Sequence, residues 1–220
     1  MKKKIYILIF CYMLVISTLS MNVFAGDQSN PEIVDMENDI IGTLIKHPIL
    51  FNILQKIGIL PIESFDFMDI NSAWFYEDES DPDYLFASVM IKNLDYTPLR
   101  AIYSIRWTYN EKNYAAACHT HSDGEFSWFS AGGVYGIFDN WAYNKGLIQD
   151  ITDCKIDLEE NVINFKIPKD LVGDPKPGDV LTYTNAWTGL RFICEILTYP
   201  LGGEMASDPT SYGKDYIVQY

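Results

Sequence analysis

Apolar residues occupy every second position through most of the chain after residue 66. This alternation is typical of strands that bury one face. Clusters of turn-forming residues separate the alternating segments, so the expected fold class is mostly β: an antiparallel β-sandwich of about eight or more strands. The predicted strands are Phe67–Tyr76, Tyr84–Asn93, Ala101–Tyr109, Lys112–Thr120, Ile151–Leu158, Val162–Ile167, Val180–Cys194 and Asp215–Tyr220.

Residues 40–60 follow a different period. Their apolar side chains recur three and four positions apart, which indicates a short helical insertion near the N-terminus. Pro48 interrupts the pattern, so two short helices and one kinked helix are both compatible with it. We expect this insertion to pack against one end of the sheet; an apolar docking face for a partner is the alternative.

The first 25 residues have the pattern of a secretory signal peptide. Three lysines precede the apolar run Ile5–Ile16, and Val23-Phe24-Ala25 suits cleavage before Gly26. An uncleaved N-terminal anchor is the alternative. We therefore expect a secreted or extracytoplasmic protein. No other apolar stretch reaches the roughly 18 residues of a membrane span, so none is expected in the mature chain.

The expected domain organisation follows from these patterns. Residues 1–25 form the signal peptide, residues 26–66 an acidic entry segment with the helical insertion, and residues 67–220 the β-sandwich. Residues 26–220 are expected to fold as one domain, because about 195 residues suffice for one core.

The chain is strongly acidic, with 30 acidic and 16 basic side chains and a net charge of −14. Such a surface repels phosphate backbones, which argues against nucleic acid as a partner. The charge is compatible with cation binding. Outside the signal segment three cysteines remain, Cys118, Cys154 and Cys194. A disulfide among them and buried free thiols are both left open.

Several short motifs resemble a known family. Asn30–Asp35 is followed by Phe67–Phe75, which contains "Met-Asp-Ile" and a Trp, and Val162–Pro168 contains "Phe-Lys-Ile-Pro" before Leu171-Val172-Gly173. This order resembles the DOMON-like and family-9 carbohydrate-binding-module sandwiches. The resemblance implies an extracytoplasmic β-sandwich that binds sugars, haem or a partner domain. The insertion at residues 40–60 departs from that family. No ligand-contacting residue of the family matches a position in this sequence.

Two histidines and an aspartate form a candidate metal site. If the strand Lys112–Thr120 extends through His121, His119 and His121 share one face, and Asp123 follows closely. Two imidazoles and a carboxylate are plausible zinc ligands, and they would support a metal-dependent hydrolase. The alternative is a polar strand end that enters a turn. No other catalytic motif is present in the sequence.

Two acidic clusters are candidate hosts for a structural calcium ion, because calcium binds through oxygen ligands. One lies between Glu77 and Asp83, and the other comprises Asp35, Glu37 and Asp39. Their spacing matches no EF-hand, and a solvated loop is the alternative reading for each. Apart from this ion no cofactor is expected.

The segment 126–143 contains seven aromatic residues in 18 positions, against 15% in the whole chain. Glycines lie among them, so we expect part of the segment to be loop with some rings exposed. The predicted ligand-binding residues are Trp128, Tyr135, Trp141 and Tyr143. The expected function is a non-catalytic binding module for carbohydrate or for an extracytoplasmic protein. The alternatives are the hydrolase and a structural envelope protein.

Overall fold

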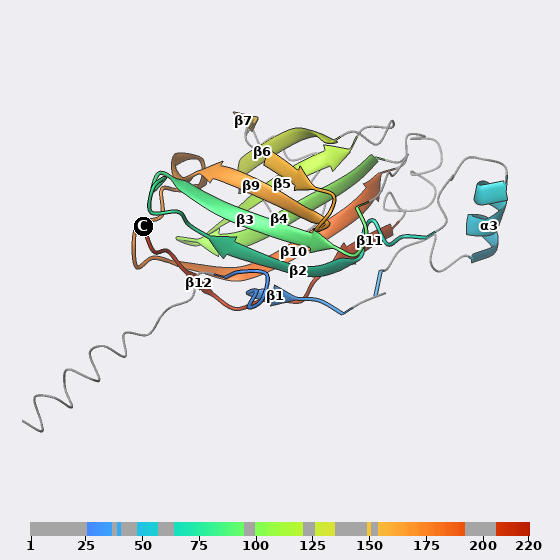
Figure 1. The fold of residues 1–220 in the computed structure, drawn as a ribbon, viewed down its shortest axis with the longest axis horizontal. Helices are drawn as coiled ribbons and strands as arrows, with labels where there is room; N and C mark the ends of the chain where they lie inside the picture. Colours follow the sequence, from blue (N-terminus) through green and yellow to red (C-terminus); the bar gives the residue numbers. More distant parts are fainter. Residues whose placement is uncertain are drawn as a thin grey trace, which may run out of the picture.

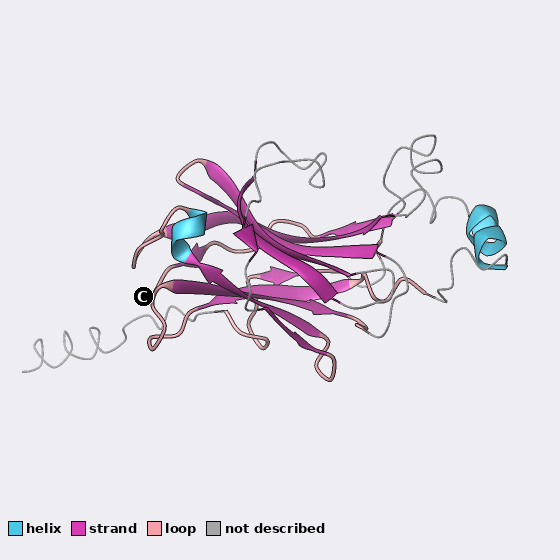
Figure 2. Cartoon of the chain, turned by 90° about the horizontal axis from the view of Figure 1, so that it is seen from above, coloured by secondary structure: helices cyan, strands magenta, loops and turns pink. Residues whose placement is uncertain are grey.

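The structure is a computed structural model that describes residues 26–36, 39–40, 48–56, 64–94, 100–120, 126–134, 149–150, 154–191 and 206–220. The described residues include twelve strands in two antiparallel sheets, which Figures 1 and 2 show as two layers. The prediction of a mostly β fold is confirmed. Within the described residues, no helix is long and apolar enough to cross a membrane.

The first sheet has five strands in the order β1-β2-β3-β9-β8. Its outer edge is formed by the N-terminal segment, because Ile33 pairs with Ala73 and Val34 with Ser72. The strands are β1 (Ile33–Val34), β2 (Ile70–Tyr76), β3 (Tyr84–Ile91), β8 (Cys154–Asp157) and β9 (Val162–Pro168).

The second sheet has seven strands in the order β11-β10-β4-β5-β6-β7, with β12 also paired to β10. Asn110 and Glu111 form the turn of the hairpin between β4 and β5. Their φ angles of 48° and 61° suit a two-residue type I′ turn, which matches the twist of the flanking strands. The strands are β4 (Arg100–Tyr109), β5 (Lys112–Thr120), β6 (Phe126–Val134), β7 (Gln149–Asp150), β10 (Val180–Arg191), β11 (Ala206–Pro209) and β12 (Tyr216–Ile217).

One hydrophobic cluster contains buried side chains from both sheets. The alternating side chains Tyr103, Ile105, Trp107 and Tyr109 of β4 all belong to it, as their spacing predicts. Phe75 of β2 meets Trp107 edge to face, with ring centroids 5.4 Å apart. Aromatic contact between the layers therefore contributes to the core.

Four strands were not predicted: β1, β6, β7 and β11. Three of them have two to four residues, too few for a period to be detected. The fourth, β6, contains the run Ser-Ala-Gly-Gly, which reads as loop. A 3₁₀ turn at Lys169–Val172 directly follows β9.

One helix, α3 (Pro48–Lys56), lies within the region of helical periodicity. Pro48 is its first residue, where the missing N–H costs no intrahelical bond. The side chains of Ile49 and Ile53 are 76% and 49% exposed, and Figures 1 and 2 show α3 beyond one end of the two layers. These side chains thus do not pack on a sheet as expected. Residues 41–47 and 57–63 lie outside the described residues.

Candidate metal centre

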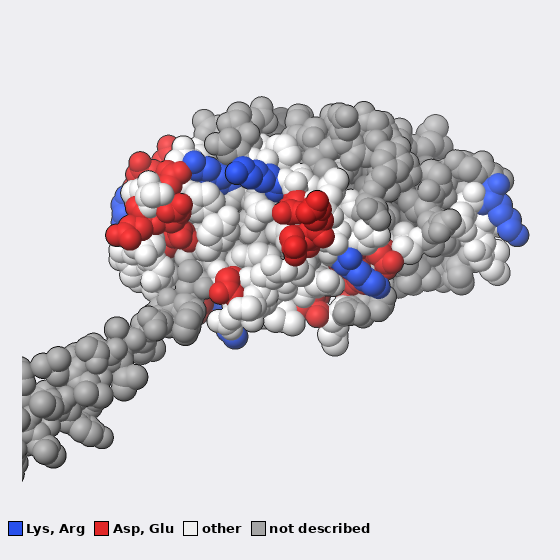
Figure 3. All heavy atoms as spheres, viewed as in Figure 1, with Lys and Arg blue, Asp and Glu red and all other residues white. Residues whose placement is uncertain are grey.

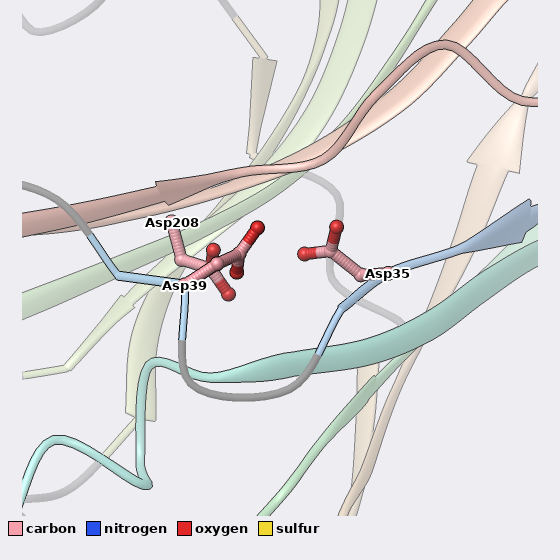
Figure 4. Close-up of side chains that lie close together, drawn as sticks. All are labelled: Asp35, Asp39 and Asp208. Atoms are coloured by element: carbon pink, nitrogen blue, oxygen red, sulfur yellow. The ribbon is translucent and has the colours of Figure 1, made fainter.

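Three aspartates from separate parts of the chain meet at one point. Carboxylate oxygens of Asp35, Asp39 and Asp208 all lie within 4.8 Å of one another. Figure 4 shows the carboxylate of Asp35 pointing toward those of Asp39 and Asp208. In the described part of the chain, no other group of three or more potential metal-ligating side chains lies this close together.

The N-terminal segment brings two of these residues to the sheet. Asp35 directly follows β1, and its backbone N–H donates to the carbonyl of Asn71 at 3.1 Å. This bond extends the pairing of β1 with β2 by one residue. Asp39 belongs to the same N-terminal segment, and its carboxylate lies beside that of Asp35.

Asp208 comes from β11, at the edge of the second sheet, where it pairs with Thr188 of β10. Its side chain is fully buried, and its Oδ2 accepts a hydrogen bond of 2.7 Å from the backbone N–H of Ile70. Ile70 is the first residue of β2, beside an irregularity in the pairing of β2 with β3. Because an irregularity of this kind releases ladder groups, the N–H of Ile70 is available to the aspartate.

One carboxylate oxygen of each aspartate lacks a hydrogen-bond partner. Asp35 Oδ2, Asp39 Oδ1 and Asp208 Oδ1 are inaccessible and accept no hydrogen bond. The Oδ1 atom of Asn71, the residue after Ile70, is a further buried oxygen without a partner. Buried carboxylate oxygens are normally paired, because leaving them unpaired is costly. Three such orphans at one point therefore call for a positively charged ligand.

The raised pKa values of Asp208 and Asp35 also favour a cation at this point. Burial, together with the charges of Asp35 and Asp39, raises the pKa of Asp208 to about 8, although the bond from Ile70 opposes this rise. Burial and the neighbouring charges of Asp39 and Asp69 raise the pKa of Asp35 to about 6. Among the described residues, no lysine or arginine forms an ion pair with these three aspartates. Asp69, whose charge acts on Asp35, is itself paired with Lys92 at 3.2 Å.

The donor set selects a class of metal. All candidate donors are oxygens, and three of them carry charge when ionised. Calcium and magnesium prefer such hard ligands, whereas zinc favours nitrogen and sulfur. Magnesium requires near-ideal octahedral geometry and releases water reluctantly, so a buried group of carboxylates on irregular backbone fits calcium better.

Only His119 of the predicted zinc site lies within the described residues. His119 lies on β5 opposite Ile102 and Ser127, and its side chain is half-buried. His121 and Asp123 lie outside the described residues. Of the predicted ligand-binding residues, Trp128 belongs to β6, but its side chain is not described. Tyr135, Trp141 and Tyr143 lie outside the described residues.

The aromatic segment is in part regular structure. Its first nine residues form β6, which pairs with β5 along most of its length. Phe129 packs against the hydrophobic cluster rather than forming part of an exposed face. At least one of the seven rings thus contributes to the core.

The second acidic cluster, Glu77–Asp83, has partners of its own. Glu77 is buried against Lys169, Asp78 accepts hydrogen bonds from the N–H and hydroxyl of Ser80, and Asp81 pairs with Lys166 at 2.6 Å. These carboxylates are therefore less suited to a cation than the aspartate group.

Cys118 and Cys154 are free thiols whose pKa is raised by burial, and Cys194 lies outside the described residues.

Comparison with known proteins adds no relative to this picture: no family model, no curated protein and no solved structure matches the chain. The sequence indicates Asp35 and Asp39 through their acidic surroundings. Asp208, in the run Ser-Asp-Pro, reads as an ordinary turn, and the sequence alone carries no sign of its role.

Proposed function

We propose that the protein is a secreted, non-catalytic binding module whose two sheets form a β-sandwich with a calcium ion bound by Asp35, Asp39 and Asp208. The observation that carries the calcium proposal is the meeting of three carboxylates whose inaccessible oxygens have no partners. The ion would join the N-terminal segment to β11 and hence the first sheet to the second. Its role is structural.

The burial of the centre supports a structural role rather than a catalytic one. Asp208 has no exposed surface, and the orphan oxygens are inaccessible. A catalytic metal needs an open position for water or substrate. Calcium takes six to eight oxygens, so backbone carbonyls or water would complete the shell around the three carboxylates.

An extracytoplasmic ligand, a carbohydrate or a protein, remains our proposal for the partner. The motifs that resemble DOMON-like and family-9 carbohydrate-binding sandwiches support it, as does the signal-like N-terminus. The acidic surface argues against nucleic acid. Figure 3 shows acidic side chains in separate groups on one face, with basic side chains and uncharged surface between them, so a neutral ligand meets little repulsion there.

Calcium binding is the first prediction. After calcium has been removed with a chelator, isothermal titration calorimetry should give a stoichiometry of one calcium ion per chain. Replacing Asp208→Asn keeps an acceptor for the N–H of Ile70 but removes one charge from the centre. We expect it to weaken calcium binding at least about 100-fold. Even changes of residues that only orient metal ligands lower metal affinity by about 10–100-fold.

Asp215→Asn is the matched control, since Asp215 is exposed and lies outside the centre. It should leave calcium affinity unchanged although it removes one negative charge, as Asp208→Asn does. Extracellular calcium sites bind in the range of about 10⁻⁴ to 10⁻³ M. Absence of binding by the unmodified protein at several millimolar calcium would refute the calcium proposal and leave the binding-module proposal standing.

The second prediction concerns the aromatic segment and the partner. A glycan array with the mature protein is the screen for a ligand. If Trp141 stacks on that ligand, Trp141→Ala should lower affinity by about 1–3 kcal/mol with little loss of stability. If the ring is part of a core, the same change should lower the free energy of unfolding by about 3–5 kcal/mol. Large losses of stability for both Trp128→Ala and Trp141→Ala would contradict a binding face.

A further inference from the structure

Glu32 is a buried acid that lacks a cation. Its side chain is only 9% exposed, and its Oε2 accepts a hydrogen bond of 2.9 Å from the backbone N–H of Phe75 in β2. No lysine or arginine among the described residues forms an ion pair with it. Burial raises its pKa to about 7, and the charge of Lys214 offsets this only in part. The charge of Glu32 in turn contributes to the raised pKa of Tyr216.

Gly26 lies directly against this carboxylate. Gly26 is buried, and its backbone N–H donates to Glu32. A Cβ atom placed on Gly26 would lie 2.1 Å from Oε2 and 2.3 Å from Oε1 of Glu32. Any residue with a side chain would therefore displace the carboxylate. Glycine allows the main-chain nitrogen and the acid to meet.

The turn between the two residues creates this contact. Asp27 Oδ1 accepts hydrogen bonds from the backbone N–H groups of Ser29 at 2.7 Å and Asn30 at 2.9 Å. Such a turn around an aspartate reverses the chain locally. It brings Gly26 back onto Glu32, which precedes β1 by one residue.

We propose that cleavage of the Ala25–Gly26 bond turns the nitrogen of Gly26 into an α-ammonium group that forms a buried ion pair with Glu32. The proposal rests on the secretion proposed above. In the cleavage, a signal peptidase adds water across the amide, Ala25 leaves with the new carboxylate, and the amine of Gly26 is protonated at neutral pH. The peptide nitrogen offers one donor and no charge, whereas the ammonium offers three donors and the missing positive charge.

The ion pair would make the fold depend on processing. Glu32 adjoins β1, so the pair anchors the mature N-terminus to the first sheet at Phe75. In the precursor the acid stays buried without a counter-charge, which is unfavourable. The precursor is therefore less stable than the mature protein, and removal of the signal peptide strengthens the fold once export is complete.

Four proteins test the proposal: the mature chain beginning at Gly26 and the same chain with a Gly-Ser extension, each with and without Glu32→Gln. The extension moves the ammonium by about 7 Å. It should lower the melting temperature by about 5–15 °C when Glu32 is present, the effect of separating a buried pair, and by less than about 2 °C in the Glu32→Gln background. Glu79→Gln is the control for loss of an acid, because Glu79 is exposed.

A second readout uses only the mature and extended chains and needs no Glu32→Gln variant. The side-chain carboxyl of Glu32, followed by carbon NMR, should titrate well below pH 7 in the mature chain and near pH 7 in the extended chain. Equal melting-temperature losses in both backgrounds, or identical titrations, would overturn the ion pair. Intact mass of the secreted product distinguishes this failure from failure of the proposed secretion: a product that does not begin at Gly26 would refute the processing step itself.

Discussion

Replacing Lys169 by methionine is expected to lower the free energy of unfolding by about 3–5 kcal/mol, because it leaves a buried carboxylate without its counter-charge. The Nζ atom of Lys169 lies 2.6 Å from Oε1 of Glu77, and the two side chains are 5% and 0% exposed. The same carboxylate accepts a hydrogen bond of 3.0 Å from the hydroxyl of Tyr216. Urea unfolding followed by circular dichroism measures the loss.

The effect should extend to the C-terminal strand. Lys169 also donates to the backbone carbonyl of Tyr220, and Glu77 accepts from the backbone N–H of Gln219. These bonds hold the segment that follows β12, which pairs with β10 only through Ile217 and Tyr216. In the Lys169→Met protein, amide hydrogens near residue 217 should therefore exchange faster than those of β4 in the core.

Two further proteins make the test specific. Lys176 forms an exposed pair with Asp174, in which the side chains are 66% and 55% exposed. Lys176→Met should change stability by no more than about 0.5 kcal/mol. Combining Lys169→Met with Glu77→Gln removes both charges and keeps an acceptor for Tyr216, so the double variant should be more stable than Lys169→Met alone. A loss below about 1 kcal/mol for Lys169→Met would contradict the buried pair.

Glu77 also illustrates what the sequence leaves hidden. In the run from Glu77 to Asp83 it looks like one of five equivalent solvated acids. Asp78 and Glu79 are exposed as expected, whereas the side chain of Glu77 is fully buried. Its partners come from the 3₁₀ turn after β9 and from the C-terminal segment, and local sequence carries no information on such distant neighbours.

The strands, by contrast, follow from local physics. Alternation with a period of two determines which side chains face the core, so the inward rows of β4 and the positions of seven other strands could be predicted. The β4–β5 hairpin is also local, because two residues separate its strands. The pairing of β3 with β9 and of β10 with β4 depends on contacts far apart in the sequence, which periodicity does not specify.

The metal centre could be predicted from the sequence only in part. Asp35 and Asp39 attract attention by their acidic neighbourhood, while Asp208 reaches them only because β11 pairs with the edge of β10. Glu37, the third acid of the predicted cluster, lies outside the described residues. A prediction of the ligand set would have needed the order of strands in the second sheet.

The stability of the calcium-free protein should fall as the pH rises from 5 to 8. Asp208 has a pKa of about 8 in the folded protein, above its ordinary value of 3.8, so the folded state binds a proton more tightly than the unfolded state. A raised pKa of an acid contributes stability that is fully present below the ordinary pKa and is lost as the pH rises through the folded value. Asp35, with a pKa of about 6, acts in the same direction.

The expected loss between pH 5 and pH 8 is about 3–5 kcal/mol, since each unit of pKa corresponds to about 1.4 kcal/mol. The acids whose pKa is lowered in the folded state, Asp66 and Asp179 among them, titrate below this window and do not interfere. Thermal melts in the presence of a chelator, at several pH values, measure the slope. Asp208→Asn cannot titrate at this position, so its melting temperature should vary much less with pH.

Calcium should reverse the trend. The ion competes with protons for the same carboxylates, so its binding releases protons and strengthens with pH. At pH 8, where the unbound centre is least favourable, millimolar calcium should raise the melting temperature most; at pH 5, where Asp208 is protonated, it should raise it little. For Asp208→Asn the increase should be small at both values. An increase at pH 5 as large as at pH 8, or an increase in Asp208→Asn as large as in the unmodified protein, would mean that the stabilising ion binds elsewhere.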